Sequence, residues 1–155
     1  MIFMINIILP EIYAQKIKRE FIERTISAFF QHEHLSSEID VSIVFESDEE
    51  IQKLNAQFRG INQPTDVLSF SAQETDPETG RLYLGDVIIS YPRALTQAKL
   101  AGHTVESEIQ LLIIHGMLHL MGFDHDTEVK KKEMWQKQEG LLKHLSVQIK
   151  QLPED

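Results

Sequence analysis

The chain has 155 residues, about the length of one domain. A domain of this size buries roughly two thirds of its unfolded surface without the help of disulfides or structural metal ions. The absence of cysteine excludes disulfides, thiolate metal sites and thiol nucleophiles, so any metal ion must be held by nitrogen and oxygen ligands. A formal net charge of −9 argues against nucleic-acid binding, which usually requires a basic surface, unless a local basic patch overcomes it.

The N-terminal part of the chain is apolar, but it carries neither a basic leader nor a small-residue cleavage site. No apolar stretch is long enough to cross a bilayer, so we expect a cytoplasmic protein without membrane contact. Residues 2–9 are predicted to form the first strand. Pro10 marks a junction, and residues 11–30 are predicted to form one amphipathic helix. Its apolar positions near helical spacing are Ile12, Ile17, Phe21, Ile22 and Phe29.

The next two elements are a strand and a capped helix. Residues 39–46 alternate apolar and polar side chains, which is typical of a strand with one buried face. Ser47 and Glu50 have the spacing of a capping box, and the apolar positions that follow keep helical spacing up to Gly60. We therefore expect a helix that begins after Ser47 and ends at Gly60.

Two β-rich runs follow the turn after Gly60. Residues 67–71 and 82–90 flank a segment, residues 74–80, whose composition favours turns, so two neighbouring strands in hairpin order are predicted. Ser90 can then begin a short helix that reaches about residue 100, and Gly102 is placed to end it.

The last part of the chain predicts two further helices. Thr104 is an N-cap candidate for a strongly apolar helix that Gly122 should stop. A final helix is expected from about residue 127 to residue 144, with three consecutive lysines, residues 130–132, on its exposed surface. The side chains available for its packing are Met134, Trp135, Leu141 and Leu142.

The predicted order of elements is βαβαββααα. It implies the α+β (mixed α/β) class, with a roughly four-stranded mixed sheet and about five helices. No internal repeat, low-complexity tract or linker divides the chain, so residues 1–155 are expected to form a single metal-dependent enzyme domain.

Three histidines form the most informative constellation. His115 and His119 are four residues apart, so on a helix they project from one face and can hold one ion. Gly122 can take a left-handed conformation that turns the chain and brings His125 back toward the same ion. Three neutral imidazoles plus water form an open tetrahedral zinc site, which lowers the pKa of the water to about 7. We predict one Zn²⁺ per chain and a small metal-dependent hydrolase.

Two alternatives to this open site remain. A structural metal would need a fourth ligand, for which Asp124, Asp126 and Glu128 are candidates. The H-x-x-x-H-x-x-G-x-x-H spacing also matches metzincin proteases, but those place a glutamate base after the first histidine, where this chain has Gly116. Gly116 is expected instead to leave space beside the ion for a bulky substrate group such as a phosphodiester.

Arg59 lies at the end of a predicted helix and could point into a cleft. A guanidinium there would bind phosphate oxygens in a bidentate manner and stabilise developing charge, although a lone arginine is more often a solvated surface residue. Asp66 and Asp86 are expected to cap turns or strand ends. The remaining histidines are expected at the surface or in local hydrogen bonds: His32, His34, His103 and His144.

Three runs of residues are informative together. Residues 64–70 read Pro-Thr-Asp-Val-Leu-Ser-Phe, residues 84–86 read Leu-Gly-Asp, and residues 115–125 read His-Gly-Met-Leu-His-Leu-Met-Gly-Phe-Asp-His. Through these runs, the chain from residue 54 to residue 125 resembles the YbeY family of bacterial rRNA maturation endoribonucleases.

The resemblance implies a mixed α/β fold, a zinc ion held by His115, His119 and His125, and cleavage specific for single-stranded RNA. It implies work in rRNA maturation, notably at the small-subunit 3′ end, and in ribosome quality control. Arg59 matches the family's conserved arginine and, with His115, is expected to carry catalysis. The implied partners are single-stranded rRNA and the small ribosomal subunit or an assembly GTPase, with neither DNA nor a membrane expected.

Two positions depart from the family pattern. Phe123 stands where the family often has tyrosine, and Ser107 stands where an arginine often precedes the glutamate matched by Glu108. The metal site is expected to tolerate both, whereas the lost arginine either weakens RNA contact or only alters the surface. The alternative functions are a non-catalytic, zinc-containing ribosome-assembly factor and a metzincin-like metalloprotease that lacks the usual glutamate base.

Overall fold

The computed structural model describes residues 4–145, in which four strands form one mixed sheet. The order across the sheet is β1-β2-β4-β3, where β1, β2 and β4 are parallel and β3 is antiparallel to β4. The strands are β1 (Met4–Ile8), β2 (Ile39–Glu46), β3 (Val67–Thr75) and β4 (Leu82–Ser90). The predicted α+β class with a four-stranded mixed sheet is confirmed, while residues 2 and 3 of the first predicted strand lie outside the described residues.

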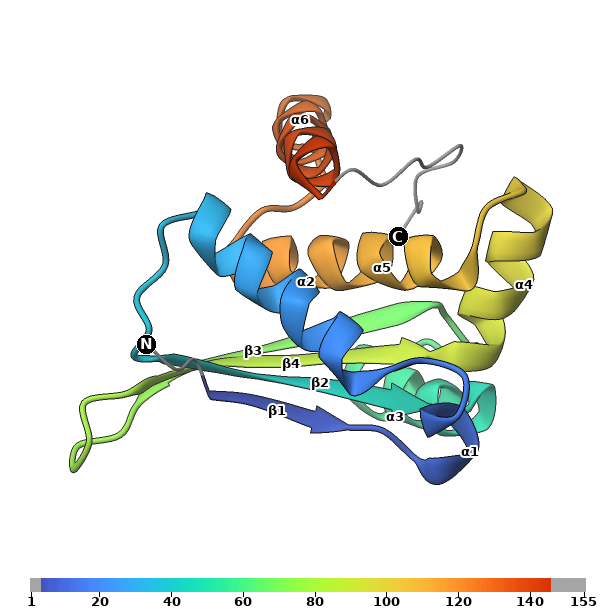
Figure 1. Cartoon of the computed structure of the whole chain (residues 1–155), viewed down its shortest axis with the longest axis horizontal. Helices are drawn as coiled ribbons and strands as arrows, with labels where there is room; N and C mark the ends of the chain where they lie inside the picture. Colours follow the sequence, from blue (N-terminus) through green and yellow to red (C-terminus); the bar gives the residue numbers. More distant parts are fainter. Residues whose placement is uncertain (1–3, 146–155) are drawn as a thin grey trace.

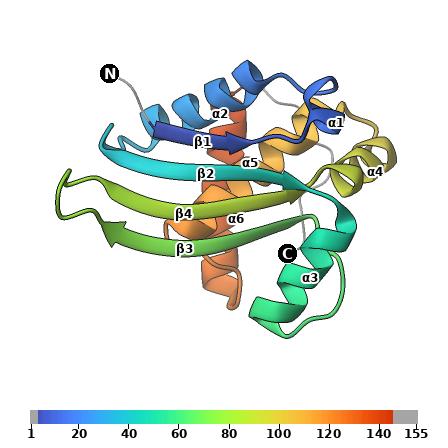
Figure 2. The same ribbon diagram turned by 90° about the horizontal axis from the view of Figure 1, so that it is seen from below.

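Helices cover the sheet unequally (Figures 1 and 2). One face carries most of them, and α6 crosses α5 in the outer layer (Figure 1). The opposite face carries α3 near one end of the sheet, where a small apolar cluster forms around Ile51, Leu68 and Ile88. The helices are α1 (Glu11–Ala14), α2 (Arg19–His32), α3 (Asp48–Arg59), α4 (Tyr91–Ala101), α5 (Val105–Leu120) and α6 (Glu128–His144).

The described residues contain six helices rather than about five, because the single helix predicted over residues 11–30 is two helices. The chain turns between α1 and α2, and this turn carries Ile17 into the core at 2% exposure. Ile12, which the helical pattern placed on the buried face, is 69% exposed. The apolar pattern therefore predicted correctly that Ile17 is buried. It did not predict that Ile17 lies in a turn between two helices.

The other predicted helix boundaries are confirmed by their caps. Ser47 accepts a hydrogen bond from the Glu50 backbone N–H at 3.2 Å, and Gly60 ends α3 in the left-handed conformation with φ 72°. Ser90 caps α4 and Thr104 caps α5 in the same way. Each cap satisfies a backbone N–H that the first helical turn leaves without a partner. No helix in the described part of the chain has the length and hydropathy needed to span a membrane.

Helix α5 is buried on nearly all sides because it lies between the sheet and the outer helices. It ends as predicted: Gly122 has φ 96°, and the Phe123 N–H donates to the Leu118 carbonyl at 3.0 Å. This is the pattern of a Schellman cap, in which a left-handed residue lets the chain reverse. The reversal directs the next residues back along the end of α5.

Gly116 marks the closest approach of α5 to the sheet. A Cβ atom at this position would lie 2.6 Å from Val87 Cγ1 and 3.1 Å from Ser69 Oγ. The Ser69 hydroxyl also donates to the Gly116 carbonyl at 2.9 Å. The expectation that Gly116 leaves space for a substrate group is therefore wrong, because β3 and β4 side chains fill that space.

Gly116→Ala is expected to lower the free energy of unfolding by about 1–3 kcal/mol, because the added methyl group overpacks the helix–sheet contact. Gly140→Ala is the matched control, since a Cβ at Gly140 meets no atom within 4 Å. Without that clash, alanine should stabilise α6 by about 0.5–1 kcal/mol. Urea unfolding monitored by circular dichroism measures both, and equal effects of the two substitutions would contradict this role of Gly116.

Candidate metal centre

Three imidazoles converge at the C-terminal end of α5. His115 and His119 lie one turn apart on the helix, with their Nε2 atoms 3.2 Å from each other. His125 comes from the loop between α5 and α6, and one ligand atom of each histidine lies within 4.8 Å of the other two. The structure thus brings together the three residues that the sequence spacing predicted as metal ligands.

The arrangement of the ring nitrogens fits a metal ion. The Gln138 Oε1 atom lies 3.0 Å from His115 Nδ1, so that Nδ1–H donates to the amide oxygen and Nε2 keeps its lone pair toward His119. In a tetrahedral site with Zn–N distances near 2.0–2.1 Å, neighbouring nitrogens lie about 3.3 Å apart. The observed 3.2 Å separation matches this value. Imidazole nitrogens are also ligands that zinc prefers.

No fourth protein ligand joins this group among residues 4–145. The Asp124 carboxylate accepts a hydrogen bond from the His125 backbone N–H at 2.7 Å, which helps to hold the loop. Asp126 pairs with Lys130 at 3.6 Å on the surface. A metal held by three imidazoles alone leaves a coordination position for water or substrate, as catalytic zinc sites do and closed structural sites do not.

Gln138 is the residue of this centre that the sequence interpretation missed. It lies on α6, is fully buried, and reaches His115 across the contact between α6 and α5. Its position is four residues after Met134 and three before Leu141, both of which are buried. A polar residue on an apolar helical face was the available signal, since a buried amide requires a hydrogen-bond partner.

Gln138→Leu is expected to weaken metal binding by about 10- to 100-fold, because His115 loses the acceptor that fixes its tautomer and ring orientation. Competition with a fluorescent zinc chelator measures the affinity. Gln136→Leu is the matched control, since Gln136 lies on the same helix and is exposed. Unchanged affinity in folded Gln138→Leu would show that this hydrogen bond does not orient the ligand.

A cavity of about 290 Å³ opens beside the histidines and brings Arg59 to the same place. Arg59 lies in the last turn of α3, the helix that precedes β3 in the sequence. Its side chain is exposed and has no ion-pair partner within residues 4–145, so the guanidinium is available to an anion. The other residues lining the cavity are Val67, Ser69, Ser71, Leu120 and Asp124.

The two other aspartates considered from the sequence have structural contacts. Asp66 is buried, its carboxylate accepts from Gln97 Nε2 at 3.2 Å, and its carbonyl accepts from the Ser90 N–H at 2.9 Å. Asp86 accepts a hydrogen bond from the Tyr83 hydroxyl on the sheet. Neither lines the cavity beside the histidines.

The remaining histidines lie outside the metal group, as predicted. His32 hydrogen-bonds to Glu33 at 2.8 Å, and His103 hydrogen-bonds to Glu108 at 2.6 Å. Glu108, the glutamate that matches the family pattern, is buried. Its hydrogen bond with His103 therefore holds the connection between α4 and α5 in place.

Sequence comparisons with known proteins agree on one family, and one solved structure is similar in fold. A family model described as endoribonuclease YbeY matches residues 10–146. A protein named endoribonuclease YbeY from Acetivibrio thermocellus is 38% identical over 141 residues, covering 83% of this chain and 87% of that protein. One of the same name from Halalkalibacterium halodurans is 47% identical over 111 residues, covering 66% and 70%. The solution structure of TM1509 from Thermotoga maritima is similar with a TM-score of 0.62 and 28% identity, covering 92% of this chain and 89% of that one.

Proposed function

The chain belongs to the YbeY family, and on this premise we propose that it is a metal-dependent endoribonuclease that cleaves single-stranded RNA in rRNA maturation. The observation that carries the proposal is the shared cavity, where three converging imidazoles and one arginine line about 290 Å³. This combination suits phosphodiester hydrolysis, which needs a positioned nucleophile and stabilisation of negative charge on phosphate oxygens.

We assign His115, His119 and His125 as the ligands of one Zn²⁺ per chain. Zinc at such a site supplies Lewis acidity and lowers the pKa of water to about 7. The chain's own contribution is to hold the three ring nitrogens in place. Gln138 orients His115, and the Asp124 carboxylate fixes the backbone of His125.

Arg59 is assigned to the phosphate. Its planar guanidinium can donate two parallel hydrogen bonds to non-bridging oxygens and stabilise the charge that develops on them in the transition state. The Ser71 hydroxyl lines the same cavity and is exposed, so it can donate to a phosphate oxygen. The Ser69 hydroxyl is already engaged by the Gly116 carbonyl.

The site favours a flexible strand over a duplex. The cavity lies between α3, β3 and the end of α5 rather than on an open surface. A single strand can bend a phosphate inward to meet Arg59 and the histidines, whereas a duplex holds its phosphates on a stiff helical surface. From membership of the YbeY family, rather than from the shape of the cavity, we propose that the natural substrate is single-stranded rRNA, at the small-subunit 3′ end and in defective ribosomes.

We propose that a binding partner brings this acidic chain to its RNA substrate. Its net charge of −9 opposes long-range attraction to RNA. Contact with the small ribosomal subunit or an assembly GTPase, in the cytoplasm, would supply that guidance. A non-catalytic assembly role predicts full cellular rescue by a metal-retaining Arg59 variant, which the catalytic role excludes.

A cleavage assay with two RNA forms tests the function. The purified protein is incubated with an oligonucleotide carrying the small-subunit rRNA 3′ end, and with the same oligonucleotide annealed to its complement. Cleavage of the single strand alone is expected, with loss on chelation and recovery when zinc is returned. Circular dichroism of the chelated protein separates metal loss from unfolding. Equal cleavage of both forms, or cleavage by folded metal-free protein, would overturn the proposal.

A further inference from the structure

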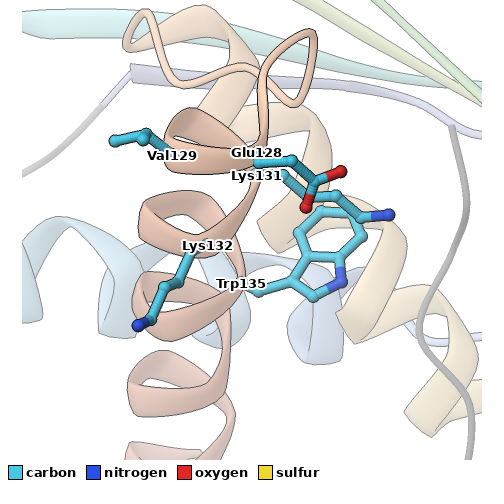
Figure 3. A pocket seen from close by; sticks show the side chains of 5 residues that line it. All are labelled: Glu128, Val129, Lys131, Lys132 and Trp135. Carbon is cyan, nitrogen blue, oxygen red and sulfur yellow. The ribbon is translucent and has the colours of Figure 1, made fainter.

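A second, shallow cavity of about 450 Å³ lies on the outer surface of α6, near the helix N-terminus (Figure 3). Its central side chain is Trp135, with Lys131 reaching toward the indole and Lys132 extending to the other side of the helix (Figure 3). Val129 adds an apolar side chain that is 69% exposed. This surface therefore presents a large aromatic ring flanked by two cations on a protein of net charge −9.

This surface adjoins the candidate metal centre. The Trp135 ring centroid lies 5.9 Å from that of His115 and 5.9 Å from that of His125. The indole therefore forms the wall between the histidines and the outer cavity. Trp135 thus lies directly beside the candidate metal ligands, although it lines the outer cavity and not the one that Arg59 shares with the histidines.

The local charge on this surface is positive although the chain is acidic. Lys131 and Lys132 are exposed, and neither forms an ion pair within the described part of the chain. Lys131 Nζ lies 6.0 Å from the Trp135 ring centroid, a loose contact that an incoming planar group can replace. Glu128 also lines the cavity, so that two lysines and one carboxylate leave a net lining charge of +1.

We propose that Lys131, Lys132 and Trp135, together the α6 platform, bind the nucleotide of single-stranded RNA next to the one being cleaved. The inference rests on the proposed function and extends it from the metal centre to one neighbouring nucleotide of the strand. Trp135 stacks on the base, because aromatic rings hold bases of any sequence by their faces. Lys131 and Lys132 attract the flanking phosphates, which supplies a local basic patch on an acidic protein.

Binding of a short fluorescein-labelled oligouridylate, measured by fluorescence anisotropy in an Arg59→Ala background that slows cleavage, tests the platform. Trp135→Leu is expected to weaken binding about tenfold, and Trp135→Phe to weaken it less because a stacking ring remains. Lys131→Ala combined with Lys132→Ala should reduce the slope of log affinity against log salt by about 1.4, since two phosphate contacts are lost.

Lys143→Ala is the matched control, because Lys143 is exposed on the same helix about 18 Å further along its axis. It should leave both affinity and salt slope unchanged. Zinc content is measured on every variant, because Trp135 packs against two of the proposed ligands. If Trp135→Leu loses metal, the double lysine variant decides the question.

The outcomes separate the platform from the proposed function. Metal-retaining variants that bind as tightly as the parent, with the same salt slope, would overturn the platform even if the wild-type protein cleaves RNA. Absence of any oligouridylate binding by the parent would overturn it as well. If the variants bind oligouridylate more weakly than the parent but the wild-type protein cleaves no RNA, the platform would be supported and the proposed hydrolase function would be overturned.

Discussion

Replacement of Arg59 by glutamate is expected to slow RNA cleavage by more than about a hundredfold while leaving one metal ion bound per chain. The substitution removes the guanidinium from the cavity beside the histidines and places a carboxylate against the phosphate. Arg59 is not one of the three proposed metal ligands and is exposed at the end of α3, so neither metal binding nor folding should change. Initial cleavage rates and zinc content of the same preparations measure both effects.

Two further variants sharpen this prediction. Arg59→Lys keeps the charge but loses the planar pair of donors, and its activity should fall between those of the wild type and Arg59→Glu. Arg24→Glu makes the same charge change at an exposed position on α2 and should leave cleavage unaffected. Full activity in metal-replete Arg59→Glu would show that the reaction does not use this arginine.

His119→Ala is expected to abolish metal binding and to lower the cleavage rate by about a thousandfold or more. Lewis-acid stabilisation of the transition state is worth several kcal/mol, and the variant loses it together with the ion. His119 lies at the end of α5 and is only partly buried, so the fold should survive the substitution. Cleavage rates at saturating RNA, with circular dichroism as the folding check, test the prediction.

His34→Asn is the matched histidine control. His34 is exposed and has a left-handed φ of 54°, a conformation that asparagine tolerates. The variant should keep wild-type metal content and activity. Cleavage by folded His119→Ala at the wild-type rate would contradict a catalytic metal at this position.

Much of the fold could be predicted from local signals. Ser47, Ser90 and Thr104 marked helix starts because each accepts a hydrogen bond from a backbone N–H three residues later. The break between α1 and α2 could not be predicted in this way. It depends on Ile17 being buried from a turn, and helical periodicity does not distinguish a buried turn residue from a buried helical one.

In the candidate site too, contacts that are local in the sequence could be predicted, and contacts that depend on packing could not. The three histidines lie on α5 and in the loop directly after it, so their spacing along the chain already implied their convergence. Gln138 and Trp135 reach them from α6, and that contact depends on how two helices pack, which sequence spacing does not encode. Gly116 was misinterpreted for the same reason, because its neighbours Val87 and Ser69 come from the sheet.

The number of zinc ions per folded chain tests the central claim most directly. It is measured by mass spectrometry on the purified wild type and on His115→Ala, His119→Ala and His125→Ala, each checked for folding by circular dichroism. We predict about one zinc per wild-type chain and its loss from each folded variant. Retention of the metal by all three folded variants would contradict the assigned ligands and the mechanism built on them.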